Sequence, residues 1–401
     1  MALTLNQFQE AKIRLQNIIT ETRLLNSTPF SQESGHTIFL KPENLQVTGS
    51  FKIRGAYNKI AKLSADQRKN GLIASSAGNH AQGVAYAAQK LGVKATIVMP
   101  KTAPLIKVEA TKSYGAHVIL AGDCYDDAFA KASQKQKEEN YLFVHPYNDL
   151  DVIEGQGTIA LEIIQEMADI DYILAPIGGG GLISGVAMAA KAINPDIKVI
   201  GVEPDGAQSM KLSLEQNRII NLERCDTIAD GVAIKNPGDI TFPIIKEVVD
   251  DIITVTDYEI LEAFLILLDK HKLVGESSGV LTLAAINKLK AKNKKVVCII
   301  SGGNIDMLNI VSMINRGLIS RGRIFCFSVN LPDKPGQLLT IYKILATENA
   351  NVIKLNHNQF KTLSRVDEVQ LEVTAETNGH QHIQSIITEL ENAGYQITKI
   401  C

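Results

Sequence analysis

Short apolar segments alternate with helical stretches over the first three quarters of the chain. They are rich in Ile and Val and mostly continuous, which is typical of strands buried on both faces of a parallel sheet. Residues 80–92 and 182–194 show the helical spacing that fills the intervals. This part of the chain is therefore predicted to form an α/β open sheet. The predicted strands are 37–41, 71–75, 95–99, 117–122, 141–145, 171–177, 198–203 and 295–301.

The pattern changes after Ile324. Residues 325–331 and 369–374 alternate apolar with polar positions, and two amphipathic helical stretches accompany them. The order strand, helix, strand, strand, helix, strand predicts a ferredoxin-like βαββαβ domain. We therefore expect a first domain over residues 1–320 and a second over residues 324–401.

Length and charge narrow the class of protein. The chain has 401 residues, more than the roughly 250–300 at which a single core stops growing, so at least two domains are expected. Lys and Arg number 41 against 43 Asp and Glu, and this balance argues against a nucleic-acid binder held by phosphate contacts. Hydrophobic residues at 45% and charged residues at 21% are the ordinary globular mixture, which excludes global disorder.

The cysteines and the N-terminal stretch indicate the cellular compartment in which the protein is expected. Five cysteines, with no C-x-x-C pair, indicate neither a disulfide framework nor a zinc knuckle, and a reduced, cytoplasmic setting is expected. The N-terminal stretch is polar and helical, without a signal-peptide core. The longest strongly apolar runs are too short to span a bilayer, so no membrane association is expected.

Four polar or glycine-rich segments follow predicted strands. They are 75–80 (SSAGNH), 178–181 (GGGG), 203–209 (EPDGAQS) and 301–304 (SGGN). Ligands bind open α/β sheets outside the carboxyl ends of the strands, so these segments are expected to converge on one site. The alternative is that each is simply a connecting loop.

The glycine run 178–181 lies between a strand and a helix. Consecutive glycines let backbone N–H groups turn toward an anion, and the helix N-terminus adds a positive dipole. The run lacks the Lys-Ser/Thr ending of a P-loop and the G-x-G-x-x-G spacing of a dinucleotide site. It therefore favours a small bound phosphate over ATP or NAD, the alternative being a flexible turn.

Lys52 lies between Phe51 and Ile53. A lysine in apolar surroundings has a depressed pKa and can act as the nucleophile that forms a Schiff base. Taken alone, such a lysine is more often a solvated surface residue. Together with a phosphate cradle and no nucleotide motif, it suggests pyridoxal phosphate (PLP).

These motifs resemble those of PLP-dependent threonine ammonia-lyases (threonine dehydratases). S-F-K-I-R-G-A, S-A-G-N-H-A-Q-G-V-A, G-G-G-G-L and S-G-G-N match that family in order and spacing, and 332–339 resembles the loop of an ACT domain. The resemblance covers essentially the whole chain. It implies the PLP-dependent type II (tryptophan synthase β-like) fold, with open, mainly parallel sheets in two subdomains, and one C-terminal ACT-like domain.

The resemblance also implies roles for individual residues. Lys52 would anchor the cofactor covalently and then act as the base at Cα. Asn79 would bind the ring hydroxyl, and Ser301 would face the pyridine nitrogen. The remaining expected cofactor contacts are Phe51, Gly178, Gly179, Gly180, Gly181, Leu182 and Glu276, with Glu276 alternatively a structural partner. The expected substrate-binding residues are Ser76, Ala77, Gly78, Asn79 and His80, although His80 alternatively only fills the turn.

Two departures from related serine racemases are informative. Those enzymes carry a serine at the position of Ala77, and without its hydroxyl a second proton donor for racemisation is missing. They also bind a divalent cation, at positions that match Glu203, Ala207 and Ser209. Loss of one carboxylate disfavours Mg²⁺ or Ca²⁺ and leaves a monovalent cation such as K⁺, or a structural loop.

The expected activity is deamination of L-threonine to 2-oxobutanoate and ammonia, with L-serine as a second substrate giving pyruvate. It would serve isoleucine biosynthesis or threonine catabolism. The alternatives are a serine dehydratase or racemase-like enzyme, and an amino-acid sensor with an inert PLP domain. The ACT-like domain would bind an effector, isoleucine or valine, near Gly336, Leu338 and Asn356 in a homodimer or homotetramer, or would be purely structural.

Overall fold

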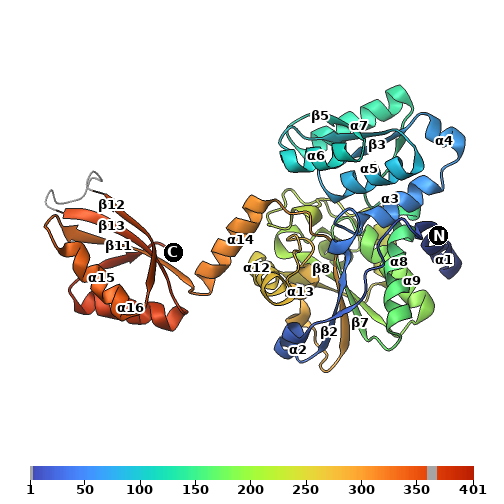
Figure 1. Cartoon of the computed structure of the whole chain (residues 1–401). Helices are drawn as coiled ribbons and strands as arrows, with labels where there is room; N and C mark the ends of the chain where they lie inside the picture. The colour runs from blue at the N-terminus through green and yellow to red at the C-terminus, as the bar shows by residue number, and fades with distance from the viewer. Residues whose placement is uncertain (1–2, 359–367) are drawn as a thin grey trace. The chain divides into compact units, whose positions relative to one another are not determined.

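The computed structural model describes residues 3–358 and 368–401. The chain divides into two compact units, Met1–Asp306 and Met307–Cys401, and each is described by itself (Figure 1). Among the residues described, no helix has both the length and the apolar character needed to cross a membrane.

The first unit contains two sheets. The larger has the order β1-β2-β10-β7-β8-β9, and only β1 runs antiparallel to its neighbour. The smaller is parallel throughout, in the order β5-β4-β3-β6. The strands are β1 (Leu25–Asn26), β2 (Thr37–Pro42), β3 (Leu72–Ser75), β4 (Ala95–Met99), β5 (His117–Leu120), β6 (Leu142–Phe143), β7 (Tyr172–Pro176), β8 (Lys198–Pro204), β9 (Asp251–Val255) and β10 (Lys295–Ile300).

Helices cover the larger sheet on both faces, with α9 on one side and α13 on the other (Figure 1). Strands β3, β4 and β10 are buried almost throughout, as their continuous apolar sequences predict. β5 differs, because it is an edge strand whose side chains stay partly exposed. Two strands of the larger sheet were not predicted from the sequence. They are the short β1 and β9, and both lie at the edges of that sheet.

Thirteen α-helices are described in the first unit. They are α1 (Leu5–Leu15), α2 (Thr28–Ser34), α3 (Lys52–Ala61), α4 (Ala65–Lys69), α5 (Asn79–Leu91), α6 (Leu105–Ser113), α7 (Tyr125–Glu139), α8 (Leu150–Glu166), α9 (Gly181–Ile193), α10 (Ser209–Glu215), α11 (Thr241–Val248), α12 (Asp257–Ile266) and α13 (Leu281–Ala284).

Helix α3 packs against both α5 and α8 (Figure 1). Its approach to α8 depends on glycine. A Cβ on Gly55 would lie 2.7 Å from the carbonyl oxygen of Val152, and a Cβ on Gly155 would lie 2.6 Å from that of Arg54. A side chain at either position would push the two helices apart, so α3 has little freedom to shift.

The second unit begins with α14 (Met307–Ser320) and continues as strand, helix, strand, strand, helix, strand, in agreement with the predicted βαββαβ order. Its sheet is antiparallel, in the order β12-β13-β11-β14. Alternate side chains of β11 and β13 are buried with residues of the two helices in one apolar core. The elements are β11 (Ile324–Pro332), α15 (Gln337–Thr347), β12 (Asn351–Asn358), β13 (Glu368–Glu376), α16 (His380–Asn392) and β14 (Ile397–Lys399).

The cysteine expectation needs one correction. Cys326 and Cys401 form a disulfide in the second unit, although the sequence suggested no such bond. The two residues lie 75 positions apart in sequence, and β14 brings them together by pairing antiparallel with β11. Cys124, Cys225 and Cys298 are free.

Candidate active site

Lys52 is the first residue of α3. Its Nζ donates a hydrogen bond to the carbonyl oxygen of Pro146 at 2.9 Å and lies 5.1 Å from the centre of the Phe51 ring. The backbone N–H of Phe51 donates to the carbonyl oxygen of Ser301 at 3.0 Å, which ties the start of α3 to the end of β10. The side chain keeps some exposed surface, yet burial of its ammonium lowers the pKa of Lys52 to about 8, against an opposing effect of Glu276.

A hydrogen-bonded chain of three side chains lies beside this lysine. Asn79 donates through Nδ2 to Oε1 of Glu276 at 2.6 Å and accepts at Oδ1 from Nδ2 of Asn304 at 2.8 Å. One N–H of the Asn79 amide thus remains for a ligand. Burial, and then the charge of Asp230, raise the pKa of Glu276 to about 7. Gly302 is needed here, because its Cβ would lie 2.6 Å from Oε1 of Glu276.

The glycine run connects β7 to α9. Gly180 has φ +94°, a left-handed conformation that favours glycine, and α9 begins at Gly181. The hydroxyl of Thr241 donates to the carbonyl oxygen of Gly179 at 2.6 Å and holds the loop. A Cβ on Gly179 would lie 2.3 Å from the ring of Tyr147. The loop thus presents the backbone N–H groups of a helix N-terminus, which suits a phosphate.

The expected substrate-binding turn leads from β3 into α5. Gly78 donates its backbone N–H to Oγ of Ser76 at 3.2 Å, and Asn79 opens the helix. The first N–H groups of α5 have no acceptor within the helix, as a carboxylate site requires. The ring of His80 instead points into the core, where Nε2 lies 2.8 Å from the carbonyl oxygen of Val144. Burial, and then the charge of Lys52, lower the pKa of His80 to about 3, so the ring is neutral.

Two other cofactor candidates are buried near these groups. The hydroxyl of Ser301 has a long contact, 3.4 Å, to the carbonyl oxygen of Ser278, and so is weakly held. Leu182 follows Gly181 in the first turn of α9 and packs into the core with Phe51. Ala77 is half-buried and packs against the core of the smaller sheet.

Among the described contacts, the segment 203–209 engages the start of α10 rather than the Lys52 region. The two oxygens of Glu203 accept the backbone N–H groups of Met210 and Lys211, each at 2.9 Å. Burial raises the pKa of Glu203 to about 7. Ala207 is buried, and Oγ of Ser209 is buried without a hydrogen-bond partner. In the described part of the chain, no group of three or more His, Cys, Asp or Glu residues is placed to hold a metal ion.

One site segment was missed. Residues 144–148 follow β6, and Pro146 and Tyr147 lie between Lys52 and the glycine loop. Nδ1 of His145 accepts the backbone N–H of Asn148 at 2.9 Å, which fixes this turn. The rule that located the other segments, polar residues after the carboxyl end of a parallel strand, would have found this one too.

The expected effector residues lie in the second unit. Gly336 has φ +91° and precedes α15, and Leu338 packs against the core of that unit. Asn356 on β12 is exposed, and its Nδ2 lies 3.4 Å from a carboxylate oxygen of Glu372.

The first unit thus holds a desolvated lysine, a glycine loop at a helix N-terminus and a second helix N-terminus beside an asparagine. This donor set fits PLP, because it offers an amine, a phosphate cradle and a polar contact with one free N–H. The chain belongs to the pyridoxal-phosphate dependent enzyme family, whose model matches residues 15–302.

Individual relatives refine this assignment. The L-threonine ammonia-lyase of Thermotoga maritima is 46% identical over 396 residues, which cover 98% of this chain and 99% of that protein. The processed form of threonine deaminase isoform 2 from Solanum lycopersicum matches with a TM-score of 0.74 and 38% identity, over 78% of this chain and 87% of that one. Maize serine racemase matches with a TM-score of 0.75 and 37% identity, over 80% of this chain and all of that one.

Proposed function

We propose that this protein deaminates L-threonine to 2-oxobutanoate and ammonia, with pyridoxal phosphate as its cofactor. The observation that carries the proposal is Lys52, a desolvated lysine with a lowered pKa, near a glycine loop suited to phosphate. The 46% identity to an L-threonine ammonia-lyase over nearly the whole chain supports the choice of substrate.

Each residue has a separate task in this proposal. When bound, PLP supplies the electron sink that makes the Cα proton of an amino acid acidic. Lys52 takes up that proton, which its lowered pKa permits near neutral pH. The glycine loop holds the phosphate, and the free N–H of Asn79 binds the ring hydroxyl. Ser301 would contact the pyridine nitrogen, and the start of α5 would bind the substrate carboxylate.

The preference between threonine and serine rests on one methyl group, which is worth only about 1–3 kcal/mol. L-Serine is therefore a second, slower substrate that yields pyruvate. Racemisation is disfavoured because Ala77 has no hydroxyl to serve as a second proton donor. At the 203–209 segment, backbone N–H groups engage both oxygens of Glu203, which supports a structural loop over a bound monovalent cation.

Steady-state turnover of both amino acids tests the proposal. We expect 2-oxobutanoate from threonine and slower release of pyruvate from serine. If threonine only shifted the absorbance of the bound cofactor and no keto acid formed, the protein would be a sensor. Conversion of L-serine to D-serine faster than to pyruvate would instead support a racemase.

The C-terminal region is proposed to be an ACT-like regulatory domain over 324–401, which follows a catalytic domain over 1–320 in the sequence. Its βαββαβ order supports this. Isoleucine or valine binds near Gly336, Leu338 and Asn356, in a cytoplasmic homodimer or homotetramer. Such an effector alters substrate affinity only if it prefers one state of the assembly.

Removal of residues after Ile324 tests this second proposal. We expect a smaller assembly and no response of threonine turnover to isoleucine or valine. A truncated protein that kept its oligomeric state and an unchanged response would refute the regulatory role and leave the deaminase activity unaffected. A full-length enzyme activated rather than inhibited by these amino acids, or indifferent to them, would argue against isoleucine biosynthesis.

A further inference from the structure

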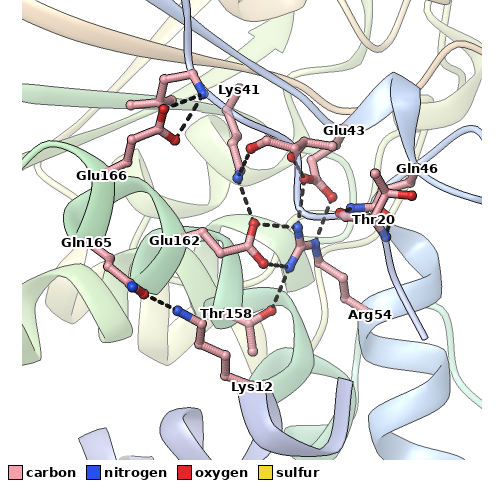
Figure 2. A network of polar contacts seen from close by, with 12 residues as sticks. Lys12, Thr20, Lys41, Glu43, Gln46, Arg54, Thr158, Glu162, Gln165 and Glu166 are labelled. Carbon is pink, nitrogen blue, oxygen red and sulfur yellow. Dashed lines mark hydrogen bonds and ion pairs between the residues drawn. The ribbon is translucent and has the colours of Figure 1, made fainter. Parts of the chain in front are cut away.

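A cluster of four charged side chains is buried in the first unit, where α3, α8 and the end of β2 meet (Figure 2). It contains Lys41, Glu43, Arg54 and Glu162, and we call it the Arg54 network. Lys41, Glu43 and Arg54 have no exposed surface, and Glu162 is 6% exposed. Two positive and two negative charges make the network neutral.

Arg54 uses its whole guanidinium group. Nε and Nη2 donate to the two oxygens of Glu43 at 2.7 and 2.8 Å. Nη1 and Nη2 donate to the two oxygens of Glu162 at 2.6 and 2.8 Å, and Nη1 also donates to Oγ1 of Thr158 at 3.1 Å. All five N–H donors of the side chain therefore have an acceptor. A lysine, with one nitrogen and no planar fork, cannot reproduce this geometry.

The network joins segments that are far apart in the sequence. Glu43 follows β2, Arg54 belongs to the first turn of α3, and Thr158 and Glu162 belong to α8. Lys41 adds a bond to Glu162 at 2.6 Å. Buried ion pairs give little net stability over apolar packing of the same shape, because desolvation offsets their attraction. Their distinctive property is directional, since only one relative placement of α3 and α8 satisfies every bond.

That placement sets the position of Lys52, two residues before Arg54. The glycine contacts of Gly55 and Gly155 hold the backbones of α3 and α8 in close approach. On the side of α5, a Cβ on Gly83 would lie 3.1 Å from the carbonyl carbon of Lys52, so that side is also closely packed. A rotation or shift of α3 would thus carry the Lys52 amine with it.

We propose that Arg54 is a positioning residue, whose fivefold hydrogen bonding to Glu43, Thr158 and Glu162 holds the first turn of α3 so that Lys52 meets cofactor and substrate in the reactive geometry. The inference rests on the role of Lys52 proposed above. Misplacement of a reacting group by 1 Å can lower a rate about 10²-fold. The network therefore acts on the rate of the chemical step more than on substrate binding.

The Arg54→Lys holoenzyme tests this proposal, because the variant keeps the positive charge and loses the planar guanidinium group with its five donors. We expect kcat for threonine to fall on the order of 10²-fold with little change in KM. The visible absorbance of the bound cofactor should change its pH dependence, and the cofactor should be lost faster on dialysis. Thr158→Val removes one acceptor of the five and should show the same changes to a smaller extent.

Phe264→Ala is the control for stability. Phe264 is fully buried in α12, outside the elements that carry the site, and its loss should lower the thermal midpoint while kcat and the cofactor spectrum stay unchanged. If Arg54→Lys lost no more activity than this control, the inference would be overturned. If Arg54→Lys did not fold, Thr158→Val with wild-type kcat and spectrum would overturn it equally. A Lys52→Ala variant that still turned over threonine would instead refute the proposed site.

Discussion

Two cationic side chains near the start of α3 have opposite surroundings. Lys52 has a single carbonyl partner, Pro146, and burial lowers its pKa to about 8. Arg54 makes five hydrogen bonds to three residues, and although burial alone would lower its pKa, the charges of Glu43 and Glu162 raise it above the ordinary value. One residue separates them in the sequence.

The difference shows how one helix can carry both a reactive residue and a residue that fixes the position of the helix. A residue that takes up a proton needs a lowered pKa, and desolvation without a strong partner provides it. A residue that fixes geometry needs a permanent charge and directional bonds, which paired arginine provides. Lys52 and Arg54 thus provide these two properties within one turn of α3.

The largest effect on activity is expected from removal of Lys52. Lys52→Ala should lower threonine turnover by at least about 10³-fold, because it removes both the cofactor anchor and the base. Release of 2-oxobutanoate measures this, with circular dichroism to verify the fold. Near-wild-type turnover by the purified variant would show that Lys52 is not the catalytic amine.

Removal of the Arg54 charge should lower the stability of the fold. Arg54→Met leaves Glu43 and Glu162 buried with too few partners, and we expect the free energy of unfolding to fall by about 3–5 kcal/mol. The matched control is Lys69→Met, which breaks the exposed pair with Asp66 and should cost less than about 1 kcal/mol. Urea denaturation measures both, and equal losses would contradict the contrast between the two environments.

A smaller effect concerns His80, whose pKa burial and the charge of Lys52 lower to about 3. The folded-state pKa lies below the unfolded value near 6.5, so His80 contributes stability above that pH and loses it as the pH falls. Between pH 6 and 5, His80 should account for up to about 1.4 kcal/mol of the decrease in the free energy of unfolding. His80→Gln should make that decrease shallower, whereas an unchanged slope would mean that the ring is not held neutral.

Much of the site could be predicted because each functional segment is local. The turn at Asn79, the glycine loop and Ser301 follow buried strands, and Lys52 could be identified from its apolar neighbours in the sequence. The Arg54 network could not be predicted in this way. Arg54 and Glu162 lie 108 positions apart, and no periodic pattern links them. A buried charge can be explained only when its partners are known, and these come from tertiary structure.

The same limit explains the other differences. The position of β5 at a sheet edge depends on strand order, which its apolar sequence does not encode. The disulfide of Cys326 and Cys401 depends on the pairing of β14 with β11.

The most direct test of the central claim is to find which residue carries the cofactor. The purified holoenzyme would be reduced with sodium borohydride, digested, and its peptides examined by mass spectrometry. The account predicts one phosphopyridoxyl group, attached to Lys52, with loss of the visible absorbance and of threonine deamination. Attachment to any other lysine, with Lys52 unmodified, would contradict it.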